Sequence, residues 1–322
     1  MPGHLAFNQT YQIMSTNYSR RGFITSAAAA TAALALPGFS ADPDIQKESD
    51  TFILNKNPLK LGLMTYLVGS KWDIGTIIKN CKEAQFEHVQ LRTTHAHGVE
   101  VTLTSAQRAD VKKRFADAGL AISLASAFQY HSTDPAELRK NIEGTKQYLQ
   151  LAFDVGALGI RVFPNAVPKE GDPTREKILE QIGKSVSECA TTGHNLGVQV
   201  RLEEHGQGTA NLPVIRKILD YADNPHVWMI WNNSDSDYTG KDLPKGYEGM
   251  SLEDQFNLVK DRIGNVHLRE LFTDYPWRKL FSLLSKSGYK GYLDIELSDQ
   301  SCEPVRMMKN YRVGFLALQN AL

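Results

Sequence analysis

Short apolar segments alternate with stretches of helical periodicity from about residue 60 to the end of the chain. Short apolar runs predict buried strands, and apolar residues that recur every three or four positions predict helices. The predicted strands span 61–66, 88–92, 121–126, 158–163, 198–203, 227–231, 266–269 and 292–296. The predicted helices span 74–83, 105–118, 135–155, 175–195, 212–221, 252–259, 277–286 and 305–318. Eight strand–helix pairs favour an α/β fold of the single-domain (β/α)8 TIM barrel type over an open doubly wound sheet.

Local signals support several of these boundaries. Thr104 with Gln107 predicts a capping box, and Asp134 before Pro135 predicts a helix start. Helix ends are predicted at the glycines Gly119, Gly156 and Gly193. No Gly-x-Gly-x-x-Gly follows the first strand, which argues further against a dinucleotide-binding fold.

The longest irregular stretch covers residues 233–250 and follows the sixth predicted strand. It contains Gly240, Pro244 and Gly246, which break regular structure. A loop of this length at the carboxyl end of a barrel strand is typical of a lid or a substrate wall.

The N-terminal segment resembles an export signal. Arg20 and Arg21 stand between Ser19 and an Ala-rich run that reaches Leu36. The run is shorter than the ~20 residues of a membrane-spanning helix. We therefore predict a twin-arginine signal peptide at 1–41, a linker at 42–57 and the barrel at 58–322, with periplasmic or other exported location and no stable membrane insertion. A chance Arg-Arg pair before an Ala-rich tail is the alternative.

Charge limits the kinds of partner that the protein can bind, and cysteine spacing indicates whether disulfides stabilise it. Lysine plus arginine equals aspartate plus glutamate at 36 each, so there is no broad basic field to hold nucleic acid or anionic lipid. A small molecule is the expected partner. Cys81, Cys189 and Cys302 are widely spaced, which indicates buried or free thiols rather than a disulfide framework, although one pair remains open.

Four residues that can bind a metal or move a proton stand at or near strand ends in the C-terminal half: Glu203, Asn232, His267 and Glu296. In a parallel barrel such strand ends converge at one mouth. Alternation along the strands places Glu203, His267 and Glu296 on inward faces, with apolar neighbours turned outward. Two carboxylates and an imidazole suit a divalent cation such as Mn²⁺, Mg²⁺, Co²⁺ or Zn²⁺.

These residues predict proton-transfer chemistry. A metal would polarise a carbonyl and a hydroxyl, and Glu203 and Glu296 could act as base and acid at the neighbouring carbon. The alternative is structural, because a strand-end glutamate is often a solvated rim residue or an ion-pair partner, here of Arg201 or Arg269. Asp294 lies deeper in its strand, and we expect it to be structural.

Five basic residues near strand ends are candidate substrate contacts. Arg92 ends the second strand and is expected to point inward, while His95 and His97 follow on the next loop. His205 lies just past Glu203, as a substrate contact or a partner of that glutamate, and Arg269 shares the inward face of His267.

Three motifs resemble the xylose isomerase-like barrel superfamily, the sugar phosphate isomerase/epimerase group. They are Leu-Glu-Glu-His-Gly at 202–206, Val-His-Leu-Arg-Glu at 266–270, and the ending from Gly288 to Glu296. The resemblance covers about residues 58–320. It implies a metal held by Glu, Asp, His and Glu at the ends of strands five to eight. Glu203, His267 and Glu296 match this set, whereas Asn232 stands in the Asp position and contributes no charge. Asp235 could substitute for it.

The resemblance implies a metal-dependent isomerase or epimerase of a sugar or keto-sugar, or a lyase/dehydratase on the same site. A non-catalytic carbohydrate-binding barrel with a decayed metal site is the competing hypothesis, and Asn232 favours it. A DNA-repair nuclease fits poorly with zero net charge and predicted export. The sequence leaves the substrate, the metal and the oligomeric state open.

Overall fold

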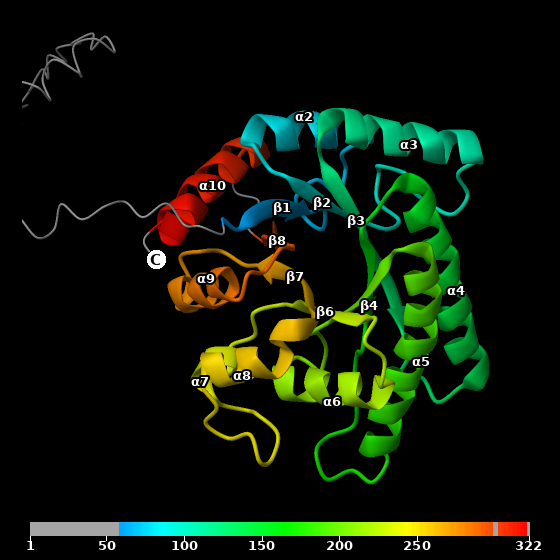
Figure 1. Cartoon of the computed structure of the whole chain (residues 1–322), viewed down its shortest axis with the longest axis vertical. Helices are drawn as coiled ribbons and strands as arrows, with labels where there is room; N and C mark the ends of the chain where they lie inside the picture. Colours follow the sequence, from blue (N-terminus) through cyan, green and yellow to red (C-terminus); the bar gives the residue numbers. More distant parts are fainter. Residues whose placement is uncertain (1–57, 299–301, 321–322) are drawn as a thin grey trace, which may run out of the picture. The chain divides into compact units, whose positions relative to one another are not determined.

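The computed structural model describes residues 58–298 and 302–320, and these form a closed eight-stranded parallel barrel (Figure 1). Each strand pairs with its sequence neighbours, and β8 pairs with β1 to close the sheet. The strands are β1 (Lys60–Met64), β2 (His88–Arg92), β3 (Ala121–Gln129), β4 (Gly159–Phe163), β5 (Gln199–Glu203), β6 (Val227–Trp231), β7 (Ile263–Leu268) and β8 (Tyr292–Ile295). The predicted TIM barrel is confirmed.

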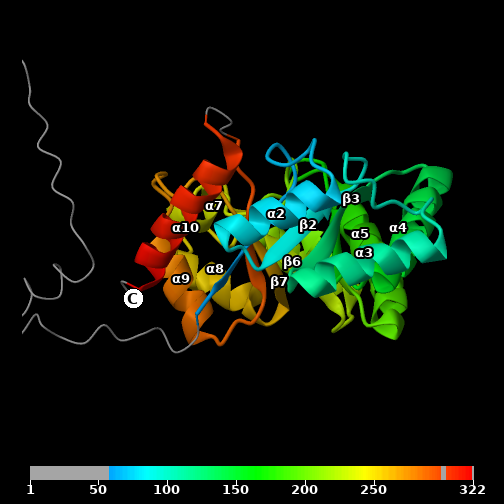
Figure 2. The same cartoon turned by 90° about the horizontal axis from the view of Figure 1, so that it is seen from above.

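Helices form a ring outside the barrel (Figures 1 and 2). They are α2 (Ile74–Ala84), α3 (Ser105–Ala118), α4 (Pro135–Val155), α5 (Arg175–Leu196), α6 (Leu212–Ala222), α7 (Ser236–Thr239), α8 (Leu252–Val259), α9 (Trp277–Lys286) and α10 (Pro304–Asn320), with a 3₁₀ turn at Lys260–Arg262. Helix α10 packs against α2 and α9, so the last helix closes the ring beside the first. All eight predicted strand–helix pairs are present.

Several predicted boundaries differ from the structure, and two of them involve glycines. Gly193 does not end its helix, because α5 continues to Leu196 and Gly197 takes the left-handed conformation at φ 71°. Strand β7 begins at Ile263 rather than Val266, because Gly264 and Asn265 belong to the strand. A Cβ on Gly264 would lie 3.1 Å from Nε of Arg201, so the glycine leaves room for that side chain. The capping box of α3 and the Asp134 cap of α4 are confirmed.

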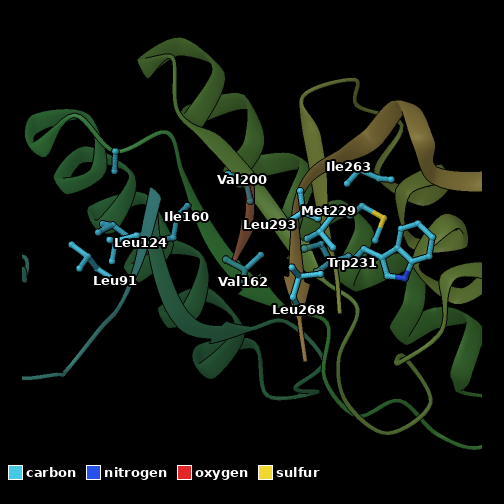
Figure 3. Close-up of a cluster of buried hydrophobic side chains, with 14 of the residues drawn as sticks. Leu91, Leu124, Ile160, Val162, Val200, Met229, Trp231, Ile263, Leu268 and Leu293 are labelled. Atoms are coloured by element: carbon cyan, nitrogen blue, oxygen red, sulfur yellow. The ribbon is translucent and has the colours of Figure 1, made fainter. Parts of the chain in front are cut away.

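The outward faces of the strands are apolar and pack against the helices. Figure 3 shows this layer, in which Leu124, Val162, Met229 and Leu293 come from four different strands. All four side chains are fully buried. Because side chains alternate across a strand, the residues between them point into the barrel. The polar residues of the strands are therefore gathered in the barrel interior.

A chain of hydrogen bonds crosses the amino-terminal part of this interior. Arg201 Nη1 donates to Ser123 Oγ (3.1 Å), and Ser123 Oγ lies 2.9 Å from His88 Nε2. His88 Nδ1 lies 2.7 Å from Asp294 Oδ1, and Asn265 donates to the other oxygen of Asp294. These side chains are buried, so the network satisfies polar groups that would otherwise be costly. This is consistent with the structural role expected of Asp294.

The segment 233–250 is fastened to the outside of β5 and β6. Asp237 in α7 accepts hydrogen bonds from Trp231 Nε1 (2.6 Å) and Tyr275 OH (3.2 Å). It also contacts Glu204, the outward neighbour of Glu203. Burial raises the pKa of Glu204 well above its usual range, with Asp237 adding to the effect, and burial raises the pKa of Asp237 to about 6. A buried carboxyl pair thus anchors this segment.

The predicted signal peptide and linker lie outside the described residues. No helix within the described ranges is long and apolar enough to cross a membrane. Cys81, Cys189 and Cys302 are all free thiols, and the first two are buried. This agrees with the predicted lack of a disulfide framework.

Candidate metal centre

Three of the four predicted ligands converge at the carboxyl ends of the strands. One ligand atom each from Glu203, His267 and Glu296 lies within 4.8 Å of the others. His267 Nδ1 is 3.4 Å from Glu203 Oε1 and 3.2 Å from Glu296 Oε2. Glu203 and His267 are almost fully buried, whereas the side chain of Glu296 is 21% exposed. The strand alternation that predicted three inward side chains is confirmed.

Gln90 on β2 orients His267. His267 Nε2 lies 2.7 Å from Gln90 Oε1, which can only accept, so the proton of a neutral ring sits on Nε2. Nδ1 then presents its lone pair to the two glutamates. A hydrogen bond to the far ring nitrogen is the usual way in which proteins fix a metal-binding histidine.

Arg161 on β4 forms a buried ion pair with Glu203. Its Nη1 lies 3.0 Å from Glu203 Oε2, and both side chains are at most 3% exposed. The structural alternative named Arg201 or Arg269 as the ion-pair partner, and neither of them pairs with Glu203. Arg201 turns toward the amino-terminal end of the barrel, where its Nε bonds Gln199, and Arg269 pairs with Asp235.

The charges of the three groups depend on each other. Burial by itself would raise the pKa of Glu203, but Arg161 and His267 outweigh it and lower the pKa to about 2. Burial would lower the pKa of His267, but Glu203 and Glu296 outweigh it and raise the pKa to about 10. Without another cation, His267 therefore carries the positive charge that balances the carboxylates. A divalent cation would replace that proton.

The donor set fits a divalent cation. Ligands of one ion at roughly 2.0–2.6 Å can lie up to about 5 Å apart, which the three atoms satisfy. Glu203 Oε2 is ion-paired with Arg161, whereas His267 Nδ1 is buried and makes no well-formed hydrogen bond within the described part of the chain. Orphaned polar atoms of this kind are expected where a ligand completes the site. Glu203, His267 and Glu296 could thus hold the metal.

Asn232, the fourth predicted ligand, follows β6 directly. Its backbone N–H donates to Glu204 Oε2 at 3.2 Å, and the residue is partly buried. Asp235, the proposed substitute, is 74% exposed and lies 3.0 Å from Arg269 Nη2. Asp235 is therefore already paired at the rim, and ligation by Asn232 stays a prediction.

Arg92 and His95 lie on the β2 side of the mouth. Arg92 Nη1 donates to the backbone and side-chain oxygens of Thr93, and burial lowers the pKa of Arg92. Its guanidinium also interacts electrostatically with Arg161 and Glu203, which places it near the centre. His95 Nδ1 is buried without a hydrogen-bond partner in the described ranges. Both residues retain donors for a substrate.

His97 differs from these. Its Nε2 lies 2.7 Å from the Arg92 carbonyl oxygen, and its Nδ1 accepts from Val99 N–H at 3.1 Å. With both ring nitrogens engaged by backbone, the imidazole has none left for a substrate. The predicted substrate contact is therefore not supported, and His97 instead ties the loop together.

His205 and Arg269 stand at the rim. His205 Nδ1 lies 2.9 Å from Asn165 Oδ1, and the imidazole packs on Phe163 at 4.5 Å between ring centroids. Arg269 lies 6.0 Å from the Tyr275 ring centroid in addition to its pair with Asp235. Both are placed where a bound molecule could reach them, and their roles stay predictions.

Sequence reasoning missed Gln90 and Arg161. Both occupy polar positions inside apolar strands, Val-Gln-Leu in β2 and Ile-Arg-Val in β4. The alternation rule that selected Glu203 applies equally to them, so parity was an available signal. Glutamine and arginine are not common metal ligands, so the residue types alone gave no reason to select Gln90 and Arg161.

Solved structures of sugar epimerases share this fold at low sequence identity. L-ribulose 3-epimerase superimposes with TM-score 0.66 at 14% identity, over 82% of this chain and 95% of that one. The 3-keto-D-glucoside 4-epimerase from E. coli gives TM-score 0.65 at 16% identity, over 81% and 100%. The IolI protein with a bound zinc atom gives TM-score 0.62 at 12% identity, over 82% and 99%. At these identities the superpositions show a shared fold alone.

No curated protein matches the chain by sequence. The profile of the family described as xylose isomerase-like TIM barrel matches residues 78–312, which is more than half of the chain. The matched region includes Glu203, His267 and Glu296. The chain therefore belongs to the xylose isomerase-like TIM barrel family.

Proposed function

We propose that the protein is a metal-dependent isomerase or epimerase of a sugar or keto-sugar that works by proton abstraction next to a carbonyl. The observation that carries this proposal is the convergence of Glu203, His267 and Glu296 around one point at the barrel mouth. Epimerases of ribulose and of a 3-keto-glucoside among the similar structures support the reaction class.

Glu203 and His267 would hold the metal from inside the barrel, and Glu296 would complete the set from its more exposed position. The bound cation would supply Lewis acidity toward the carbonyl and hydroxyl oxygens of the sugar. Gln90 keeps the His267 ring in the ligand orientation. The buried surroundings of Glu203 limit water around the reacting carbon.

Both glutamates are candidates for proton transfer, but their surroundings differ. Glu203 is fixed between Arg161 and His267, whereas Glu296 contacts only His267 among the three. A base must give up its other contacts to accept a proton, and Glu296 has fewer to give up. We assign the abstraction of the proton from carbon to Glu296. Glu203 would be the counterpart on the opposite side when an epimerisation needs one.

The substrate would be a small polyol with a carbonyl group. Arg92 and His95 offer a guanidinium and an unpaired imidazole nitrogen for hydroxyl or carbonyl oxygens. We further propose export by the twin-arginine route, on the basis of Arg20 and Arg21 before the Ala-rich run. A periplasmic location favours unphosphorylated sugars, and the zero formal charge agrees with a partner other than nucleic acid.

A non-catalytic carbohydrate-binding barrel is the second candidate. Two observations favour it: Asn232 stands where the family resemblance implies an aspartate, and Arg161 already neutralises Glu203. A lyase or dehydratase would use the same proton abstraction and differ in the leaving group, so it shares the proposed site.

Exchange of carbon-bound hydrogen with solvent tests the proposal. The wild-type protein with Mn²⁺ and a panel of ketoses in D₂O is expected to incorporate deuterium next to the carbonyl of at least one sugar, read by NMR. Glu296→Gln should abolish this exchange, while Arg216→Gln on the outer surface of α6 should retain it. Sugar binding without exchange in the metal-loaded wild type would favour the second candidate instead.

A further inference from the structure

A cavity of about 390 Å³ lies at the amino-terminal end of the barrel, opposite the metal centre. Its walls come from the first residues of β5 to β8 and the loops before them. The lining residues that matter here are Arg201, Trp228, Gly264, Tyr289, Gly291 and Tyr292.

Arg201 is the buried cation among the residues that line this cavity. Arg161 and Arg201 are register partners on β4 and β5, yet the first reaches Glu203 while the second bonds Gln199 Oε1 with Nε (2.8 Å). Nη1 of Arg201 donates to Ser123, and Nη2 has no acceptor among residues 58–298 and 302–320. The side chain is only 4% exposed, so water outside the protein does not solvate it freely.

No carboxylate within the described ranges lies at ion-pair distance from Arg201. The negative charge it interacts with is that of Asp294, which its hydrogen bonds reach only through Ser123 and His88. Burying a guanidinium is costly unless its charge is balanced and its donors find acceptors. This one has two filled donors and an adjoining cavity.

The backbone keeps the space for this side chain open. A Cβ on Gly159 would lie 2.8 Å from Arg201 Nε, and one on Gly264 would lie 3.1 Å from it. Trp228, in register with Arg201 on β6, also lines the cavity, and no hydrogen bond of its indole N–H is found among the described residues. The cavity thus combines a fixed cation, a second donor and aromatic walls.

We propose that this cavity binds a small oxyanion, such as phosphate, sulfate or a carboxylate, on the guanidinium of Arg201. A guanidinium donates two parallel hydrogen bonds to two oxygens of such an anion, and the burial of Arg201 in a low-dielectric setting strengthens them. The site is independent of the metal centre and of the reaction proposed there.

Calorimetric titration with inorganic phosphate tests the proposal, with sulfate and acetate in parallel and chloride at matched ionic strength as the reference. EDTA throughout keeps metal from contributing. The wild-type protein should show saturable binding of at least one oxyanion beyond the chloride reference, and comparison of the three identifies the preferred class. Arg201→Gln should weaken this binding at least tenfold, and Arg216→Gln should leave it unchanged.

Trp228→Phe covers the case in which the Arg201 variant does not fold, because it removes one N–H donor and keeps an aromatic wall. It should weaken binding severalfold and reduce the change in tryptophan fluorescence on titration. The proposal is overturned by the absence of saturable binding to the wild type. It is equally overturned by unchanged affinity in a folded Arg201→Gln protein or in Trp228→Phe. The hydrogen-exchange assay at the metal centre is a separate measurement, and its result does not affect the test of oxyanion binding.

Discussion

Arg161 Nη1 lies 3.0 Å from Glu203 Oε2 inside the barrel, with both side chains almost fully buried. The pair holds one oxygen of Glu203 beside a fixed cation and leaves the other facing His267. Arg161 is held in turn by the Ser126 carbonyl, which accepts from its Nε and Nη2 at 3.2 and 3.1 Å, and by the Phe163 ring. The proposed metal ligand is therefore fixed before any ion binds.

Removal of Arg161 should destabilise the metal-free protein. Arg161→Met leaves Glu203 buried without its cation, for which a loss of roughly 3–5 kcal/mol in the free energy of unfolding is expected. Arg161→Met combined with Glu203→Gln should recover part of this loss, because both charges are gone. Urea unfolding in EDTA measures both, with Arg216→Met on the surface as a control near zero. A stable Arg161→Met protein would show that the pair does not hold Glu203.

Gln90 should control metal affinity without touching the metal. Gln90→Leu removes the acceptor of the His267 Nε2 proton, and loss of such a partner typically weakens metal binding about 10- to 100-fold. Competition titration with a metallochromic chelator measures the change. Gln150→Leu, on the exposed face of α4, is the matched control and should bind as the wild type does. Equal affinities of the two variants would argue against the assigned ring orientation.

Asn232→Asp should strengthen metal binding if Asn232 is the fourth ligand. The added carboxylate supplies the charge that the amide lacks, and we expect an affinity gain of about tenfold or ~1.4 kcal/mol. Asp235→Asn should have no such effect, because Asp235 is 74% exposed and paired with Arg269. The same competition titration compares them. A loss of metal affinity in Asn232→Asp, or a large loss in Asp235→Asn, would show that Asn232 is not the fourth ligand.

Asp237 should make stability fall as pH rises. Burial raises its pKa to about 6 in the folded state, from the ordinary value of 3.8. Between pH 3.8 and about 6 the folded state therefore binds more protons than the unfolded state. The stability contributed by this group is greatest below pH 3.8 and is lost as pH rises through about 6. Asp237→Asn should stabilise the protein by about 1–3 kcal/mol at about pH 8 and much less at about pH 4.5. Urea unfolding at both pH values tests this against Asp220→Asn, and an unchanged pH dependence would contradict it.

Periodicity and alternation predicted most of the fold and the ligands from sequence. The eight strand–helix pairs carry strong patterns, and Glu203, His267 and Glu296 each follow an apolar neighbour that faces the helices. Parity decides inward from outward on any strand, so it needs no knowledge of the neighbouring strands. This is why residues far apart in sequence could be assigned to one mouth.

The ion-pair and hydrogen-bond partners of the inward polar side chains could not be predicted from alternation. Arg161 and Arg201 are inward residues of the same type at the same level, and only packing sends one toward Glu203 and the other toward the amino-terminal cavity. Gly264 and Asn265 are residue types common in loops, yet both lie inside β7. Gly264 leaves room for the Arg201 side chain, and Asn265 donates a hydrogen bond to Asp294. His97 has a side chain that can bind a substrate or a metal. In the folded chain, however, the Arg92 carbonyl and the Val99 N–H occupy both of its ring nitrogens.

Metal content of protein purified without chelator decides whether Glu203, His267 and Glu296 form a metal centre. We expect about one equivalent of a divalent metal in the wild type by mass spectrometry, its near absence from His267→Ala and a strong reduction in Glu296→Gln. His194→Ala, a surface histidine on α5, should retain the metal. A metal-free wild type that also fails to bind added Mn²⁺ or Zn²⁺ would show that these residues hold no metal, as would full metal content in the His267→Ala protein.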